Sequence, residues 1–571
     1  MLITDFFNLI FNLMPKLLLE EVLNFILSLQ LFNFVIIILA ILLITTYLPR
    51  RIESLNFLHR IGFGYFIFNF ILTTVDTLAR IKNNTFSDSG IITSNTDLLF
   101  TYIQGDYILF HLVFIFISLM LILFFYGTVD KFLLQNGDEL EFPLLIIFIT
   151  ASVLILFYVH TLIEFLLALE TISLASYICV GYERQNRHSS YASVQYFILG
   201  SIPSGFLILG IGLLYNKLGV LNFEDLDLSL SNNKVIETKN YFNLSSNEFL
   251  FNQEIYLKAV QELYLENNLL GVNSFYGSSN VLDLVSILSN TRMPIILVAI
   301  LFILFNFLFK LTAAPFHFWA PSVYKYAPVV TVTYISIISK AMVIFLLFKF
   351  ILTIYQPFIL ILTPLFLIVA LLTIFIGILG ALTERFIKPF FVYSSMGHVG
   401  FMLAGLSLFS LTGFVATFHY LIVYVISSFL MWFILMYAGQ EIRYLNSFKI
   451  LKNKNPILVL IFVFLIFSMS GIPPLGGFFI KLDVLVALLD ASRYFISIIL
   501  FFFTVITFFY YLKIIKILFF ENFENKFVKT AEVNISRLQL FVFLFLFLLC
   551  YMGLITNSAY EIGQNFLIEN L

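Results

Sequence analysis

Residues 309–328 read FKLTAAPFHFWAPSVYKYAP, and this stretch decides the fold because it interrupts a long apolar run. Lys310 stands about one turn before Pro315, and His317 follows the proline. Proline removes a backbone hydrogen-bond donor and blocks the turn before it. Inside a bilayer, the freed backbone groups are tolerated only where protein or a water-filled cavity surrounds them. The stretch therefore predicts a broken transmembrane helix with a polar interior.

A second stretch, SMSGIPPLGGFFIKLD at 468–483, has a similar organisation, with Pro473, Pro474, Gly476 and Gly477 before Lys481. Interrupted segments at corresponding places in two halves indicate inverted repeats around a site in the middle of the membrane. We expect the repeats to be the fourth to eighth and the ninth to thirteenth spans. Two unrelated packing kinks are the alternative that the prolines alone leave open.

The composition places the rest of the chain in the membrane as well. The 571 residues are 61% hydrophobic and only 11% charged, whereas a soluble domain carries about 25% charged residues. We expect an all-α polytopic membrane protein of about 14 transmembrane helices, with helices 7 and 12 broken. The expected spans are 31–48, 61–79, 107–127, 142–160, 161–182, 191–215, 295–314, 328–351, 358–380, 386–408, 411–438, 456–479, 484–512 and 538–557. Asp490 and Arg493 interrupt the thirteenth span, which moves its start toward 494.

Loop charges indicate the orientation and the domain organisation. Lys and Arg gather after odd-numbered spans, for example at Arg184, Lys325 and Arg385, and such loops face the cytoplasm or matrix. The chain divides into three N-terminal helices (1–140), a first repeat (141–351), a second repeat (352–516) and a C-terminal helix with its tail (517–571). The segment 216–293 is too polar to span, and both a small cap and a disordered insertion fit its composition.

Four ionisable residues lie inside the predicted spans or breaks, namely Glu170, Lys310, Lys340 and Lys481. Each costs about 2.5–3.5 kcal/mol at the centre of a bilayer, so such residues face the bundle interior and mark ion pathways. A neighbouring carboxylate favours the charged form of a lysine and burial disfavours it. A Glu–Lys pair that opens and closes would therefore act as a proton switch. A static internal salt bridge is the alternative.

Histidines and hydroxyl groups accompany these charges. His317 and His398 are candidate proton relays because each lies beside a polar or broken stretch. His419 fits a relay and a structural role equally. Ser339, Tyr393, Ser394 and Ser395 are further candidate anchors for hydrogen bonds.

The sequence carries no pattern for a redox cofactor or a metal site. There is no CxxC motif and no glycine-rich dinucleotide fingerprint after a strand. The two cysteines, Cys179 and Cys550, lie in apolar runs without ligand spacing. We therefore expect this chain to bind no cofactor or metal, and the net charge of −2 predicts no nucleic-acid partner.

Five stretches resemble, in order, the signatures of the chain 2 family of antiporter-like subunits of respiratory complex I (NADH:ubiquinone oxidoreductase). They are LETISLASYICVGYERQ (169–185), FKLTAAPFHFWAPSVYKYAP (309–328), RFIKPFFVYSSMGHVGFMLAGL (385–406), SMSGIPPLGGFFIKL (468–482) and FFYYLKI (508–514). The resemblance implies a fold of 14 helices with two inverted five-helix repeats. By motif, the family's glutamate of helix 5 falls on Glu170 and its partner lysine on Lys310. The central lysine falls on Lys340, the lysine of helix 12 on Lys481, and the family histidines on His317 and His398.

The resemblance also implies a function. A member of this family moves protons in the membrane arm while other subunits pass electrons from NADH to ubiquinone through FMN and iron–sulfur clusters. Expected partners are chains 4 and 4L, a lateral helix from chain 5, and lipids including cardiolipin. The expected location is the mitochondrial inner membrane, with the chain encoded in the organelle, since 72 phenylalanines indicate an AT-rich genome and no Arg-rich import signal is visible. A subunit of a multi-subunit cation/proton antiporter and a non-pumping membrane scaffold remain alternatives.

The sequence departs from the family pattern near the second break. Ile480 stands where the family commonly has glycine, and Asp483 stands where an aromatic residue is usual. We expect this carboxylate to lie close enough to Lys481 to hold its charge. Gln195 replaces a common lysine, and the 216–293 segment is longer than usual.

Overall fold

The computed structural model describes residues 145–230 and 293–520, apart from scattered positions between 146 and 158 and residues 183–185, 224, 227, 228, 439–442, 449–455 and 474. The predicted spans before residue 140, the span at 538–557 and most of the polar segment lie outside the described residues. The secondary structure of the described part is helical, with two isolated β-bridges.

The helices follow the predicted spans closely. They are α7 (Leu162–Val180), α8 (Arg187–Leu218), α12 (Met293–Lys310), α13 (Trp319–Tyr326), α14 (Val329–Thr353), α15 (Ile359–Thr383), α16 (Ile387–Leu406), α17 (Leu411–Ala438), α19 (Pro456–Ser470), α20 (Gly476–Asp490) and α21 (Tyr494–Phe519), with short 3₁₀ turns at Gln356–Phe358 and Leu445–Phe448. Six helices in the described part are long and apolar enough to cross a membrane.

The predicted span 484–512 begins at the later start that Asp490 and Arg493 indicated. Residues 484–490 belong to α20, the second half of the broken helix, and the next helix begins only at Tyr494. The reason is a tight turn in which Ser492 adopts φ 59°, a left-handed conformation that ends an α-helix. The amide of Arg493 then donates to the carbonyl of Leu488 at 2.9 Å, which closes the helix end.

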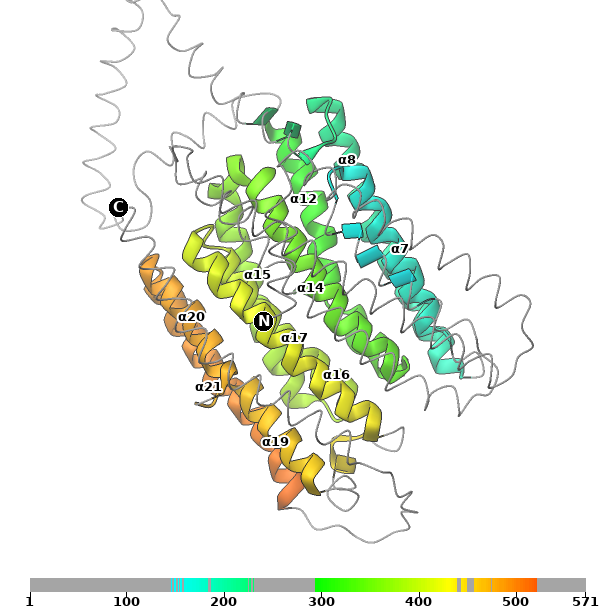
Figure 1. Ribbon diagram of the computed structural model, residues 1–571, viewed down its shortest axis with the longest axis vertical. Helices are drawn as coiled ribbons and strands as arrows, with labels where there is room; N and C mark the ends of the chain where they lie inside the picture. Colours follow the sequence, from blue (N-terminus) through cyan, green and yellow to red (C-terminus); the bar gives the residue numbers. More distant parts are fainter. Residues whose placement is uncertain are drawn as a thin grey trace, which may run out of the picture.

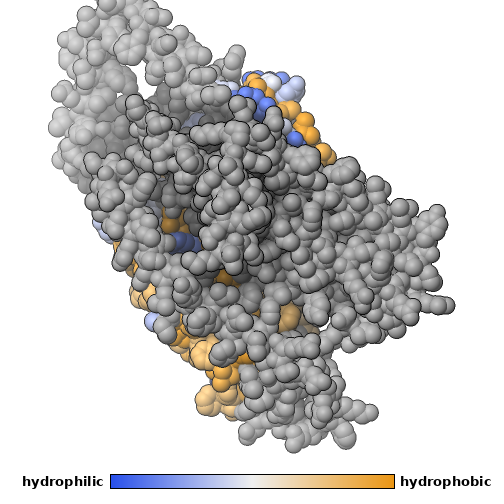
Figure 2. Space-filling model, in the orientation of Figure 1, coloured by the Kyte–Doolittle hydropathy of each residue, from blue (hydrophilic) through white to orange (hydrophobic). Residues whose placement is uncertain are grey.

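The helices form one bundle whose members lie side by side (Figure 1). The α7–α8 pair lies at one flank and α19–α21 at the other, with α14, α16 and α17 between them. In their most apolar stretches, 83% of α14 and 89% of α17 is buried, against 33% of α8 and 28% of α21. The flanking helices instead expose residues such as Phe197 and Phe502, and Figure 2 shows an orange apolar surface along the α19–α21 flank. Helices that are apolar on all sides fit a lipid environment.

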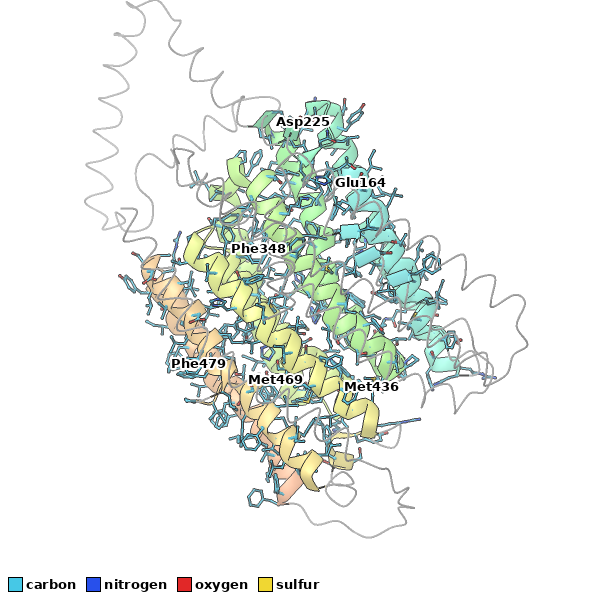
Figure 3. All side chains as sticks on the ribbon, viewed as in Figure 1. Glu164, Asp225, Phe348, Met436, Met469 and Phe479 are labelled. Carbon is cyan, nitrogen blue, oxygen red and sulfur yellow. The ribbon has the colours of Figure 1, made fainter. Side chains whose placement is uncertain are left out.

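The two ends of the bundle differ in charge. At one end, the Lys325 ammonium lies 3.7 Å from the centre of the Phe386 ring, and Phe386 forms an isolated bridge with Tyr444. These contacts gather the loops after α13, α15 and α17, which are the loops predicted to be basic. Glu164 and Asp225 lie together at the opposite end (Figure 3). This arrangement agrees with the predicted orientation.

Candidate functional site

The first break lies between α12 and α13 and is closed by protein groups. The chain turns at Thr312, which adopts φ 59°. The amide of Ala314 donates to the hydroxyl of Thr373 on α15 at 3.0 Å. The indole nitrogen of Trp319 donates to the carbonyl of Phe309 at 3.2 Å. Protein groups therefore satisfy these two polar groups of the interrupted segment, as a bilayer requires.

The second break lies between α19 and α20 and depends on glycine. Gly471 turns the chain at φ 89°, and the amides of Gly471 and Ile472 both donate to the carbonyl of Phe467 at 3.1 Å. A Cβ atom added to Gly477 would lie 1.7 Å from the carbonyl oxygen of Ser468. The two half-helices thus approach so closely that position 477 has room only for glycine.

Lys310 ends the first half-helix and reaches across to α7. Its ammonium donates to the carbonyl of Leu169 at 3.1 Å and to the hydroxyl of Ser173 at 3.3 Å. Glu170 lies between these two positions and interacts electrostatically with Lys310. Its Oε1 atom is buried without a hydrogen-bond partner among the described residues.

The predicted direct pairing of Glu170 with Lys310 is therefore not formed in this structure. Leu169 and Ser173 are one helical turn apart and share the face of α7 that meets α12, whereas Glu170 is rotated by about 100° from Leu169. The ammonium is hydrogen-bonded beside the carboxylate, and no ion pair within 4 Å joins these two described residues. The two side chains are therefore neighbours that are not paired in this structure.

A cavity of about 30 Å³ lies beside Lys310. Besides Lys310, its polar lining consists of Ser173, Ser176, Tyr177, Tyr196, Tyr334 and Ser339, from α7, α8 and α14. A buried water needs about 10–15 Å³ of such volume and polar partners. The cavity can therefore hold one or two waters between the first lysine and α14, which carries Lys340.

Lys340 is completely buried in α14. Its ammonium donates to the hydroxyl of Ser395 on α16 at 2.7 Å, and that hydroxyl donates to the carbonyl of Val392 at 2.6 Å. No carboxylate forms an ion pair with Lys340 in the described part of the chain. An ammonium has three donors, so Lys340 keeps capacity for further partners while it joins the two halves of the bundle.

His398 is also buried, and each ring nitrogen faces a phenol. Nδ1 lies 2.9 Å from the hydroxyl of Tyr420 on α17, and Nε2 lies 3.3 Å from the hydroxyl of Tyr511 on α21. The ring interacts electrostatically with both Lys340 and Lys481. A phenol can donate or accept a hydrogen bond, so these partners accommodate either tautomer of the ring.

Lys481 lies on the second half of its broken helix and reaches back to the first half. Its ammonium donates to the carbonyls of Met469 at 3.1 Å and Ser470 at 2.8 Å. These are among the last carbonyls of α19, which the break deprives of their helical partners. Figure 3 places Met469 between the two ends of the bundle, so this lysine is held at mid-depth.

The expectation that Asp483 holds the charge of Lys481 is not supported by the contacts. The Oδ2 atom of Asp483 lies 3.6 Å from Nδ1 of His419 on α17, whereas Lys481 uses backbone carbonyls. Residues two positions apart on a helix do not face each other. The Asp483–His419 contact between α20 and α17 was not predicted from the sequence.

Other candidate residues have different surroundings. His317 is buried in the first break, where its ring lies 4.4 Å from that of Phe318 and its Nδ1 atom has no hydrogen-bond partner among the described residues. Tyr393 packs against Gly380 of α15 rather than against the charged residues. Glu164 caps α7 together with Thr161, which is a structural role.

Two broken helices with buried lysines define a class of multi-pass membrane proteins with an intramembrane ionisable site. The family described as NADH:quinone oxidoreductase/Mrp antiporter, TM matches residues 160–260 and 268–507. This is more than half of the chain, and the chain belongs to that family.

Curated relatives carry similar names. NADH-quinone oxidoreductase subunit N of Wolbachia sp. subsp. Brugia malayi is 27% identical over 396 residues, which cover 67% of this chain and 72% of the relative. NADH-ubiquinone oxidoreductase chain 2 of Marchantia polymorpha is 29% identical over 364 residues, 63% of each chain. Chain 2 of Oenothera berteroana is 28% identical over 411 residues, 71% of this chain and 73% of the relative. The matched part thus spans 63–73% of these relatives' lengths.

Solved structures share the fold. A chain of respiratory complex I from Thermus thermophilus aligns with a TM-score of 0.60 at 19% identity, covering 92% of this chain and 97% of that chain. A chain of the Mrp complex from Dietzia sp. aligns with a TM-score of 0.60 at 18% identity, covering 87% and 80%. A chain of a membrane-bound sulfane sulfur reductase, an archaeal respiratory complex, aligns with a TM-score of 0.67 at 17% identity, covering 95% and 97%.

Proposed function

We propose that this chain is a proton-translocating membrane-arm subunit of NADH:ubiquinone oxidoreductase, as the names of its curated relatives suggest. The single observation that carries the proposal is the series of buried ionisable groups across both broken helices. Glu170, Lys310, Lys340, His398 and Lys481 come from α7, α12, α14, α16 and α20 and follow one another through the bundle. Buried lysines without an ion-pair partner are costly in a membrane, and function is the usual reason to keep them.

The first half acts as the switch. When the Glu170 carboxylate closes on the Lys310 ammonium, the charged form of the lysine is favoured. When the pair opens, the ammonium faces the cavity lined by Ser173 and Ser339 and can release its proton there. Closure needs only a change of side-chain conformation, because the two residues already interact across α7 and α12.

The second half receives the proton. Lys340 follows Ser339, which lines the cavity. Its ammonium is hydrogen-bonded to Ser395 of the second half. His398 interacts with Lys340 and with Lys481, so it stands between the central and the terminal lysine. A positive charge on one of these groups disfavours a positive charge on the next. The groups therefore carry protons one at a time.

The symmetry of the path follows from two inverted five-helix repeats in a fold of about 14 helices. The helix that begins with α12 runs toward the basic end, where Lys325 of α13 contacts Phe386. Tyr444 also lies at the basic end, and the helix that begins with α19 comes after it in the chain. This second broken helix therefore starts near the basic end and runs away from that end. The two broken helices therefore have opposite directions, which supports the inversion.

The cellular setting follows from the same relationship. The chain resides in the mitochondrial inner membrane, with chains 4 and 4L and a helix of chain 5 as neighbours and cardiolipin among its lipids. The redox chemistry takes place in other subunits. The similarity to chain 2 of Marchantia polymorpha and Oenothera berteroana supports this setting.

A cation/proton antiporter subunit is the second candidate, because the family includes Mrp antiporters and the Mrp complex shares the fold. The names of the curated relatives favour the respiratory enzyme. A non-pumping scaffold gives no reason to bury Lys340 where no described residue forms an ion pair with it.

Gentle extraction of the source membranes, native electrophoresis, in-gel NADH dehydrogenase staining and mass spectrometry test the proposal. We expect peptides of this chain to peak in the large NADH-oxidising band. A peak in a smaller assembly without this activity would favour the antiporter or the scaffold.

A further inference from the structure

The two phenols around His398 have a geometry that simple packing does not require. Tyr420 and Tyr511 come from different helices, α17 and α21, and both are buried. Their hydroxyls meet the two nitrogens of a single ring at 2.9 Å and 3.3 Å. The hydroxyl of Tyr511 also bonds to that of Ser394, so it stands between a serine of α16 and the imidazole.

The two contacts are unequal, which separates two roles. The shorter contact joins Nδ1 to Tyr420. If Nδ1 carries the proton of the neutral ring and donates to Tyr420, the lone pair of Nε2 faces Tyr511. In that tautomer, Nε2 is the nitrogen that can take up an additional proton.

The serine beyond Tyr511 leads toward the central lysine. Ser394 precedes Ser395 in α16, and Ser395 accepts the hydrogen bond of the Lys340 ammonium. The Ser395 hydroxyl thus bonds to Lys340 and the Ser394 hydroxyl bonds to Tyr511, which faces Nε2 of His398. No hydrogen bond among the described residues joins the two serines, so a bridging water completes the series. Each of these groups can accept one proton while it donates another, so none of them needs to become charged for long.

We propose that Tyr511 is a proton-relay residue that loads and unloads Nε2 of His398, and that Tyr420 is a positioning residue that fixes the ring tautomer. In the loading step, the O–H bond of Tyr511 breaks as an N–H bond forms at Nε2. A proton released by the Lys340 ammonium re-forms the O–H bond, so the phenol stays neutral, the lysine becomes an amine and the imidazole becomes an imidazolium. Unloading breaks the N–H bond at Nε2 and forms an N–H bond on the neutral amine form of Lys481, so the imidazolium returns to a neutral imidazole and that amine becomes an ammonium.

The inference rests on the proposed function, and four variants of the intact complex in sealed vesicles test both. Tyr511→Phe removes only a hydroxyl, and Tyr420→Phe removes the tautomer partner. Tyr355→Phe is the matched control, because Tyr355 is completely buried and its hydroxyl has no hydrogen-bond partner among the described residues. Lys340→Met tests the proton path itself. Proton uptake is measured per assembled complex, and assembly is measured by native electrophoresis.

We expect Tyr511→Phe to slow proton uptake by about tenfold, which is less than the roughly 10²–10⁴-fold effect typical for loss of a positioned acid–base group. Tyr420→Phe should have a smaller effect, and Tyr355→Phe none. Normal uptake in Tyr511→Phe together with loss in Lys340→Met would overturn the relay alone. Normal uptake in Lys340→Met would overturn the proposed function. If Tyr511→Phe does not assemble, Ser394→Ala interrupts the same hydroxyl series, and normal uptake in that variant would overturn the relay.

Discussion

The two broken helices each hold a lysine ammonium inside the bundle, but with different hydrogen-bond partners. At the first break, Lys310 ends the half-helix and donates across the bundle to α7. It lies beside Oε1 of Glu170, which has no hydrogen-bond partner in the described part of the chain. At the second break, Lys481 donates to two carbonyls of its own helix pair. Lys310 lies next to a carboxylate, so it can exchange its hydrogen bonds for an ion pair. Lys481 is bound to two backbone carbonyls and has no described carboxylate as an ion-pair partner. Under the proposed function, this difference assigns the switching step to the first break.

The largest effect should come from filling the second break. A Cβ at Gly477 would meet the backbone oxygen of Ser468 at 1.7 Å, so Gly477→Ala forces the half-helices apart. Overpacking of this kind costs about 1–3 kcal/mol, and more when the contact is backbone. We expect most of the assembled complex to be lost, as measured by native electrophoresis. Gly205→Ala is the control, since nothing lies within 4 Å of its added Cβ, and equal losses in both variants would contradict the close approach.

A smaller effect, on transport rather than assembly, should follow removal of the charge at the first break. Glu170→Gln keeps the shape of the side chain but abolishes the closed pair, so proton uptake per complex should fall by about tenfold. Glu164→Gln alters the same helix at its capping box and should leave uptake per complex unchanged. If the two variants behave alike, the first break does not switch.

The smallest effect concerns the residue that turns each break. Thr312 adopts φ 59°, whereas the second break places glycine at φ 89°. A left-handed conformation costs a non-glycine residue about 1–2 kcal/mol, and substitution by glycine removes this cost. Glycine also increases the conformational entropy of the unfolded chain, which offsets part of the stabilisation. Thr312→Gly should therefore raise the free energy of unfolding by up to about 1 kcal/mol, visible as a small rise in the thermal midpoint of the purified complex. A fall in that midpoint would show that Thr312 is not strained.

Local sequence predicted the helices and both breaks because proline, glycine and intramembrane charge act where they stand. Lys310, Lys340 and Lys481 were identified for this reason. The partners of these lysines were not predictable in the same way. Whether Lys310 meets Glu170 or its neighbours depends on how α7 is rotated, and a helix that is apolar all round gives no periodic signal of its rotation.

Two further features show the same limit. Among 29 tyrosines, the sequence does not indicate that Tyr420 and Tyr511 face one histidine, because their helices are far apart in the chain. The sequence alone is enough to predict that Asp483 points away from Lys481, since residues two positions apart on a helix do not face each other. Its contact with His419 still required the packing of α17 against α20.

The central claim is that a proton crosses from the first half to the second half through Lys340. Lys340→Met keeps a long unbranched side chain and removes its terminal ammonium, with the charge and the hydrogen bond to Ser395. The decisive measurement is the number of protons taken up per NADH oxidised by assembled complexes carrying this variant. The account predicts a large fall in that ratio with normal assembly, and an unchanged ratio would contradict it.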